Sequence, residues 1–417
     1  MSIASTAAPA SNSTGQRRHL RLLVGVQDGT LSGVNTYVEH IAAAAATAID
    51  DVTLLVADEG LAAELGQRYG SNVRIVPIGL ARPTPGQRRI ERISPGYAAR
   101  RLTAALVAAR PRIGEGFDAA HLNHPHLAAT ARPLARLVFV AAWYYPHSMT
   151  ARVISTWQHS GRRFPRSAGL ALKGTLHHRN DARGYRSADT IVAPTRALAE
   201  QLRRAGLDAV HSTPPASLLA APGSGVLPER RDRPEPRLLV CSGDLGHPRK
   251  NVGLAIDAIA LLGASGVPME LELVGGNAAS LDRRLSRLPA SVRVTASGRL
   301  PAAEVHQRMR AADLLLFPSL FEEWGYVAAE AALQGTAVVT LPVYPFQEML
   351  EPPLGFSAAG LHPADYAEAI TRALASEASR AEVAERAEQR FGLESAGRRL
   401  AALWGGDPLT TAPGAHR

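Results

Sequence analysis

Two carboxylates stand eight positions apart in the segment FPSLFEEWGYVAAE, residues 317–330. A short apolar run ends at Phe317, a loop carries Glu322 and Gly325, and a helix containing Glu330 is expected to follow. Carboxylates at the carboxyl end of a strand can accept hydrogen bonds from the hydroxyls of a sugar or a ribose. Acidic residues near a helix N-terminus also complement the helix dipole, so the segment alone leaves both interpretations open.

A second loop carries positive charge. The segment SGDLGHPRKN, residues 242–251, follows an apolar run and precedes an expected helix that begins near Val252. Free backbone N–H groups at that helix start, together with Arg249 and Lys250, form an anion site suited to a diphosphate. A solvated basic turn is the alternative. Lys250 is one of two lysines among 46 basic residues, and its position in this loop favours the functional interpretation.

Two further candidates lie in the first half of the chain. The loop DGTLSG, ending at Gly33, has small residues that let a ligand approach the backbone, although an ordinary turn is equally consistent. The run HLNHPH, residues 121–126, has imidazoles that can hydrogen-bond a sugar or transfer a proton. Its ligands are too few for a metal site, so we expect no metal. Tyr145 and His147, one apolar run later, are acceptor-side candidates.

The elements that position these loops are short apolar runs alternating with helical patterns, which predicts parallel sheets covered by helices on both faces. Strands are expected at 20–26, 52–56, 73–77, 119–122, 137–142 and 190–193, and in a second series at 237–241, 270–274, 292–295, 314–318 and 337–341. We predict an α/β fold with two doubly wound Rossmann-like domains facing a cleft.

Proline and charge patterns set the expected domain boundaries. Six prolines crowd between residues 211 and 237, which is typical of a linker. The expected parts are a disordered leader (1–18), an N-terminal acceptor-binding domain (19–212), a linker (213–236), a C-terminal nucleotide-sugar domain (237–392), a helix returning to the N-terminal domain (393–405) and a disordered tail (406–417).

Composition excludes several classes of protein. Of the 417 residues 46% are hydrophobic and 20% charged, which is globular composition. No run approaches the roughly 18 apolar residues of a membrane span. The phosphate-loop, Rossmann-glycine, nucleophile-elbow and zincin motifs are all missing from the sequence. The single cysteine, Cys241, permits no internal disulfide, so we expect a cytoplasmic protein.

Taken together, these segments resemble glycosyltransferase family 4, whose members have the two-domain GT-B fold. The spacing of Glu322 and Glu330 matches the family's Glu-x7-Glu motif. Its surroundings match as well: Ala312-Asp313 before the strand, Pro318-Ser319 at its end, and the run 330–335 after it. The resemblance covers roughly residues 20–400 and is stronger in the second half.

The resemblance implies a retaining hexosyltransferase that uses a UDP- or GDP-type nucleotide sugar as co-substrate, without a bound metal or cofactor. In the implied donor site, Glu330 binds the ribose and Glu322, near Gly325, faces the sugar. Lys250, Arg249 and the backbone at Gly33 bind the diphosphate. The base lies near Gly275 and Arg299. The implied catalytic residues are Glu322, Lys250 and His124. The leaving phosphate would deprotonate the acceptor hydroxyl, so no protein nucleophile is needed.

The sequence departs from the family pattern at two places. Asp244 follows Gly243 where many members have an arginine, so either Arg249 supplies the missing charge or the donor differs. The sugar-facing histidine falls on Asn123 or His124, of which we favour His124. Two alternatives to glycosyl transfer remain. One is a GT-B enzyme that epimerises a nucleotide sugar or couples a cyclitol, and the other is a non-catalytic nucleotide-sugar-binding partner.

Charge is distributed unevenly along the chain. Residues 1–212 have a net charge of +12 and the remainder −3, and the segment 132–186 has ten basic residues against one acidic residue. A solvated face is the simple interpretation. We expect instead that this segment meets a phosphorylated acceptor or the anionic inner face of the plasma membrane. Nucleic acid is not expected, since no recognition motif accompanies the charge. The acceptor is expected to be a cell-envelope, lipid-linked or specialised-metabolite glycan.

Overall fold

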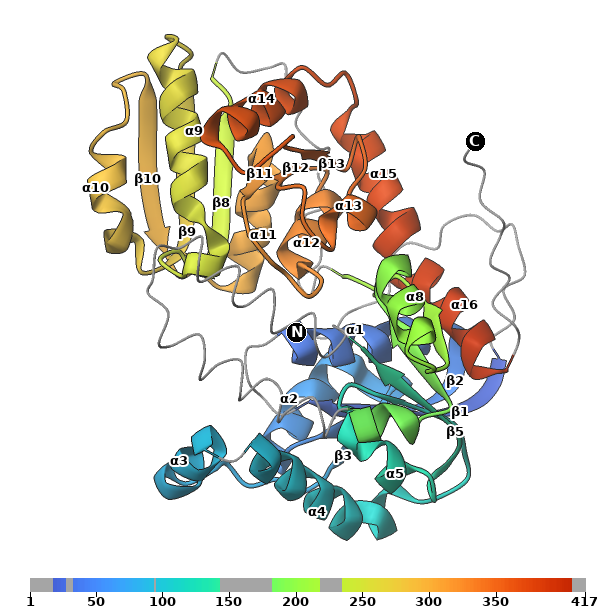
Figure 1. The fold of residues 1–417 in the computed structure, drawn as a ribbon. Coiled ribbons are helices and arrows are strands. Elements are labelled where there is room, and N and C mark those ends of the chain that lie inside the picture. The colour runs from blue at the N-terminus through green and yellow to red at the C-terminus, as the bar shows by residue number, and fades with distance from the viewer. Residues whose placement is uncertain (1–17, 28–32, 94, 143–181, 218–234, 407–417) are drawn as a thin grey trace. The chain divides into compact units, whose positions relative to one another are not determined.

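The computed structural model describes residues 18–27, 33–93, 95–142, 182–217 and 235–406. Contacts divide them into two units. The N-terminal unit contains the described residues up to Pro215 and those from Leu393 onward, and the C-terminal unit contains those from Ala216 to Gly392. Each unit is a parallel sheet covered by helices (Figure 1). The predicted α/β class with two Rossmann-like domains is therefore confirmed.

The sheet of the N-terminal unit has seven parallel strands in the order β3-β2-β1-β4-β5-β6-β7. They are β1 (Arg18–Gln27), β2 (Ile49–Val56), β3 (Arg74–Pro77), β4 (Phe117–Leu122), β5 (Ala135–Ala141), β6 (Thr190–Ala193) and β7 (Ala209–His211). Each expected strand of this series is present. Strand β7 was not expected, because three residues are too short to show a periodic pattern.

The helices of this unit are α1 (Gly33–Ala48), α2 (Glu59–Tyr69), α3 (Pro85–Ile93), α4 (Pro95–Ile113), α5 (Ala128–Ala131), α8 (Arg196–Arg204) and α16 (Leu393–Trp404). Helix α16 comes from the end of the chain and packs on α1. Gly397 permits this close packing, since a Cβ there would lie 2.3 Å from the Ala44 carbonyl oxygen.

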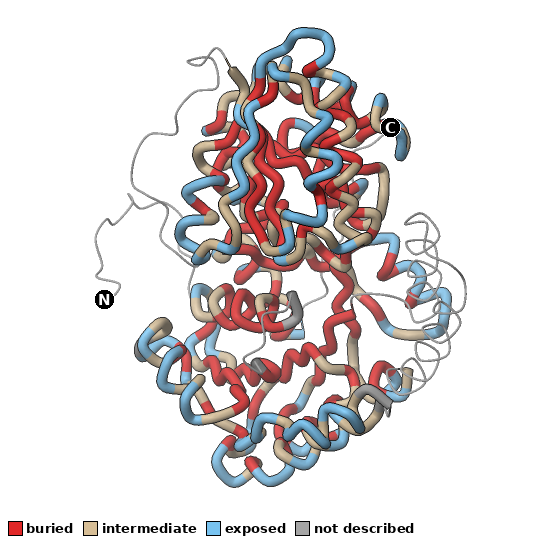
Figure 2. Tube along the Cα trace, turned by 90° about the vertical axis from the view of Figure 1, so that its left-hand side faces the viewer, coloured by how far each residue is buried: buried red, intermediate tan, exposed pale blue. Residues whose placement is uncertain are grey.

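The sheet of the C-terminal unit has six parallel strands in the order β10-β9-β8-β11-β12-β13. They are β8 (Arg237–Asp244), β9 (Met269–Gly276), β10 (Val292–Gly298), β11 (Leu314–Phe317), β12 (Ala337–Thr340) and the unexpected, three-residue β13 (Gly355–Ser357). The helices are α9 (Val252–Ala264), α10 (Asp282–Leu285), α11 (Ala302–Ala311), α12 (Tyr326–Leu333), α13 (Phe346–Met349), α14 (Pro363–Leu374) and α15 (Arg380–Phe391). Figure 2 shows buried residues filling the middle of each unit.

Strand order places the candidate loops. In each sheet the winding reverses beside the first strand, between β1 and β4 and between β8 and β11. At such a pair of strands, the loops at the carboxyl ends run to opposite faces of the sheet. Ligands of doubly wound folds bind in the crevice between these loops. The loops singled out in the sequence follow these four strands. The C-terminal sheet therefore brings its two candidate loops together, and the N-terminal sheet places Gly33 and the run 121–126 at the ends of neighbouring strands.

Candidate active site

The loop after β8 carries the two predicted diphosphate ligands. A short turn over Pro248–Lys250 presents Arg249 and Lys250, and Asn251 takes the left-handed conformation (φ 50°) before α9 begins. The His247 Nδ1 atom accepts a hydrogen bond from the Arg249 backbone N–H at 3.1 Å. Burial first, and Arg249 second, lower the pKa of His247, which keeps this acceptor nitrogen unprotonated. His247 therefore holds the turn in shape.

Asp244, the departure from the family pattern, is engaged within its own loop. Its Oδ1 atom accepts hydrogen bonds from the Gly246 backbone N–H at 3.0 Å and from the Asn277 Nδ2 atom at 3.1 Å. The carboxylate thus ties the loop after β8 to the residue following β9. This is a structural role for Asp244 that its position in the sequence did not indicate.

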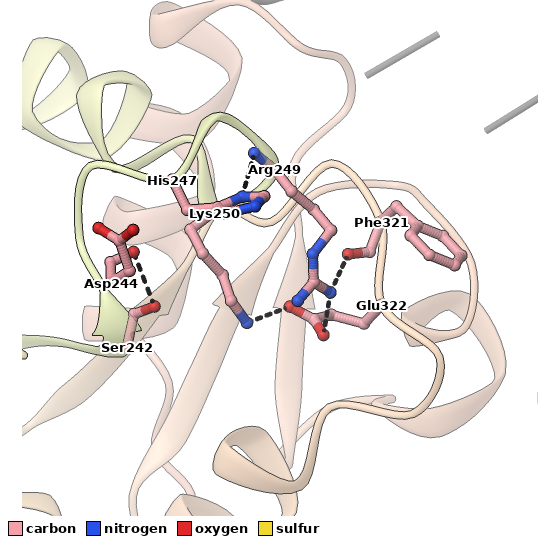
Figure 3. Close-up of polar contacts among 7 residues, drawn as sticks. All are labelled: Ser242, Asp244, His247, Arg249, Lys250, Phe321 and Glu322. Atoms are coloured by element: carbon pink, nitrogen blue, oxygen red, sulfur yellow. Dashed lines mark hydrogen bonds and ion pairs between the residues drawn. The ribbon is translucent and has the colours of Figure 1, made fainter. Parts of the chain in front are cut away.

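Glu322 lies at the centre of the polar contacts in Figure 3. Its Oε1 atom is 2.5 Å from the Lys250 Nζ atom, and its Oε2 atom is 2.7 Å from the Arg249 Nη1 atom. Arg249 Nη1 also donates to the Phe321 carbonyl at 3.0 Å. The Leu320 N–H donates to the Arg249 carbonyl at 2.9 Å. The loops after β8 and β11 are therefore joined by side chains and by backbone.

The three charged groups have a net charge of +1. Burial raises the pKa of Glu322, but Lys250 and Arg249 outweigh it and hold this pKa below its usual range. The carboxylate is therefore ionised near neutral pH. Burial raises the pKa of the neighbouring Glu323. Among the described residues Glu323 is in no ion pair, and two adjacent glutamates in a sequence do not reveal which one is paired.

Gly325 forms the entry to α12. Its φ of 93° is in the left-handed region, and a Cβ there would lie 2.9 Å from the Phe346 ring. Glu330 lies one to two turns into that helix, with its Oε2 atom 3.8 Å from the His306 Nε2 atom of α11. Burial first, and Glu330 second, raise the pKa of the Cys241 thiol to about 12, while Lys250 acts in the opposite direction. Glu330 and Lys250 are therefore both close enough to Cys241 of β8 to influence its pKa.

The residues predicted to lie near a nucleotide base come together at the end of β9. Gly275 has φ 146°, and a Cβ there would lie 1.8 Å from the Ser242 carbonyl oxygen, so a side chain cannot fit. At Gly276 a Cβ would lie 2.8 Å from the Arg299 Nε atom. Arg299 therefore lies against the backbone beside Gly275.

In the N-terminal unit, hydrogen bonds hold the carboxyl end of β4 and the residue that follows it. His121 is buried, and its Nδ1 atom accepts from the Trp404 indole N–H at 3.1 Å. An indole N–H can only donate, so neutral His121 carries its proton on Nε2, which lies 2.6 Å from the Tyr37 hydroxyl. Burial lowers the pKa of His121 to about 3, which keeps it neutral. Sequence reasoning missed Tyr37 and Trp404.

Asn123 and His124 have different surroundings. The Asn123 side chain is buried, donates to the Val26 carbonyl at 3.0 Å and accepts from the Val26 N–H at 3.2 Å, so it extends the contact between β4 and β1. His124 is partly exposed, and its ring centroid is 5.4 Å from that of His126. Burial, and then His124, lower the pKa of His126 to about 3.

The remaining predictions fall partly outside the described residues. Gly33 is the first residue of α1, and the loop before it, 28–32, is not described. Tyr145, His147 and most of the basic segment 132–186 lie outside the described residues. Within the described ranges no group of three His, Cys, Asp or Glu side chains is arranged to hold a metal ion. No helix among those same ranges is long and apolar enough to cross a bilayer.

Two family models match the chain, one in each unit. Residues 32–215 match the glycosyl transferase 4-like domain, and residues 228–390 match glycosyl transferases group 1. Among curated protein sequences, none matches this chain.

Several solved structures share this fold at low sequence identity. A sucrose-phosphate synthase from Thermosynechococcus elongatus has a TM-score of 0.62 and 18% identity, covering 94% of this chain and 99% of its own. The lipopolysaccharide outer core galactosyltransferase WaaB, in its apo form, has a TM-score of 0.59 and 14% identity, covering 92% and 99%. WaaG, a glycosyltransferase involved in lipopolysaccharide biosynthesis, has a TM-score of 0.54 and 18% identity, covering 93% and 99%.

The family matches account for most of the chain, and the structural neighbours share its two-domain fold from end to end. The chain therefore belongs to the glycosyltransferases of the GT-B fold, in the family 4 type.

Proposed function

We propose that this glycosyltransferase moves a sugar, with retention of anomeric configuration, from a UDP- or GDP-type nucleotide sugar to a hydroxyl acceptor. The observation that supports it most is the contact of Arg249 and Lys250 with Glu322 at the carboxyl ends of β8 and β11. Two cations fixed beside the start of a thirteen-residue helix are suited to a diphosphate.

The chemistry we assign to these residues is electrostatic. Negative charge accumulates on the leaving diphosphate in the transition state, and fixed positive groups stabilise that charge more than they stabilise the ground state. Before the donor binds, Glu322 holds both cations in place through its two oxygens. When the diphosphate engages Arg249 and Lys250, the Glu322 carboxylate becomes available to the hydroxyls of the donor sugar.

The other donor contacts follow the same sheet edge. We assign the ribose to Glu330, and the base to the backbone at Gly275 and the Arg299 side chain. We assign His124 to the donor sugar from the N-terminal unit. The acceptor hydroxyl attacks the face that the phosphate leaves, and the phosphate oxygen takes its proton, so no covalent intermediate with the protein forms.

As the acceptor we propose a hydroxyl on a cell-envelope, lipid-linked or specialised-metabolite glycan, bound by the N-terminal unit, and a cytoplasmic site of action. Donor panels with cell extract, followed by NMR of the purified product, test both the transfer and the anomeric outcome.

Wild-type protein should release nucleoside diphosphate and form a product of retained configuration, and Glu322→Ala should abolish turnover. Glu323→Ala is the matched control, because among the described residues Arg249 and Lys250 pair with Glu322 and not with this neighbouring carboxyl. Epimerised donor without transfer, an inverted product, or donor binding without any turnover would each contradict the proposal.

A further inference from the structure

A strongly basic surface lies on the outer edge of the N-terminal unit. Residues 79–113 contain eight arginines and one acidic residue, Glu91. They form helices α3 and α4, which follow each other along one side of the unit (Figure 1). This segment is distinct from the basic segment 132–186 that the sequence pattern emphasised.

Among the described residues, carboxylates pair with only part of the positive charge of this surface. The Glu91 carboxylate forms an ion pair with Arg101, with 2.8 Å between Glu91 Oε1 and Arg101 Nη1. Arg82, Arg89 and Arg100 are exposed and have no acidic partner within the described residues. By contrast, Arg21, Arg68 and Arg132 of the same unit pair with carboxylates. An outside anion is the partner that such unpaired charges can bind.

Apolar side chains accompany these arginines. Ile90 and Val107 are 44% and 45% exposed, and they are the two large hydrophobic residues that the described part of this unit exposes. Ile90 directly follows Arg89. Val107 lies seven positions, or two helical turns, after Arg100, so both lie on one face of α4. The opposite face buries Leu102, Leu106 and Ala109 in the core. The outward face is therefore both basic and apolar.

We propose that the α3–α4 surface, defined as Arg82, Arg88, Arg89, Ile90, Arg100 and Val107, binds an anionic lipid bilayer. The guanidinium groups would contact lipid phosphates, and Ile90 and Val107 would enter the boundary between headgroups and acyl chains. A nucleic acid would use the arginines but would leave both apolar side chains in water. The proposal is independent of the sugar-transfer chemistry.

Flotation of the full chain with phosphatidylcholine vesicles, with and without phosphatidylglycerol, tests the proposal. Binding should require phosphatidylglycerol and weaken with added salt. Arg89→Gln/Arg100→Gln should lower the partition coefficient about 25-fold, because each charge near the surface contributes about five-fold. Ile90→Ser should lower the partition coefficient about tenfold, because the variant has no apolar side chain at this position to transfer from water into the bilayer.

Matched controls lie in the C-terminal unit. Arg283→Gln/Arg287→Gln removes two exposed arginines, and Leu261→Ser changes a side chain that is 48% exposed. Neither should change binding by more than about twofold, which is within ordinary surface effects. Equal losses in the test and control variants, or no binding to phosphatidylglycerol vesicles, would overturn the proposal. Unchanged thermal unfolding shows that each variant is folded.

Insertion is measured with a fluorophore at Ile90→Cys. The chain has one native cysteine, Cys241, which is buried, so the introduced thiol is labelled selectively. An environment-sensitive dye at this position should shift to the blue on phosphatidylglycerol vesicles, and the same dye at Leu261→Cys should not. A dye that stays in water, combined with oligonucleotide binding that depends on Arg89 and Arg100, would identify a nucleic-acid surface and refute the proposal.

Discussion

Replacing Glu322 by Gln should make a nucleoside diphosphate bind more tightly while it slows sugar transfer. Glu322 occupies both cations of the candidate diphosphate site in the structure, so it competes with the ligand for them. Glutamine keeps the size and the acceptor oxygen of the side chain but removes the negative charge. The local net charge then rises from +1 to +2.

The size of the effect follows from Coulomb's law. The relevant charges are the Glu322 carboxylate and the diphosphate of a bound nucleotide. If these charges lie about 6 Å apart, they repel each other by about 3 kcal/mol at an effective dielectric constant of about 20. Arg249 is 32% exposed and Lys250 18%, so solvent weakens the interaction. Half of that energy, about 1.5 kcal/mol, corresponds to about tenfold tighter binding. Lys250→Met should act in the opposite direction, by about 10- to 100-fold, because a charged hydrogen bond is lost.

Isothermal titration with UDP and GDP measures both effects, and the double variant completes a thermodynamic cycle. The two substitutions should not be additive, since their side chains touch at 2.5 Å. Weaker nucleotide binding by the folded Glu322→Gln protein would refute the competition argument. It would mean that the carboxylate holds the cations in the only useful geometry.

Three further predictions concern stability. Gly275→Ala should destabilise the C-terminal unit by at least about 3 kcal/mol in urea unfolding, because its Cβ would lie 1.8 Å from the Ser242 carbonyl oxygen. A Cβ at Gly243 would have no atom within 4 Å, so Gly243→Ala should hardly change the unfolding free energy. Trp404→Phe should cost about 1–3 kcal/mol by leaving His121 Nδ1 buried without a donor, and an unchanged unfolding midpoint would exclude that role. Between pH 7 and pH 5 the unfolding free energy should fall by about 4 kcal/mol, since His121 and His126 have folded pKa values near 3 and take up protons only when unfolded, below about pH 6.5. His126→Leu should remove about half of this pH dependence, and a full dependence in that variant would contradict the assignment.

Several elements of the fold and site were predictable because their signals are local. Buried parallel strands appear as apolar runs, so the longer strands were found at nearly their observed bounds. Gly325 and the turn before α9 were recognisable because left-handed or anion-binding turns require particular residues. The three-residue strands β7 and β13 could not be predicted from the sequence, because their pairing with neighbouring strands defines them and their own residues show no pattern.

The sequence by itself determined which loops carry charge and which strands precede them. The tertiary structure alone decided which of those loops meet. Lys250 and Glu322 are 72 positions apart and touch because β8 and β11 are neighbours in the sheet. Trp404 reaches His121 across 283 positions because α16 packs on α1. Asp244 is held by the Gly246 N–H, whereas Arg89 of α3 and Arg100 of α4 have no carboxylate partner among the described residues. Both follow from one physical reason: a charge acts according to its neighbours in space, and strand order and helix packing set those neighbours.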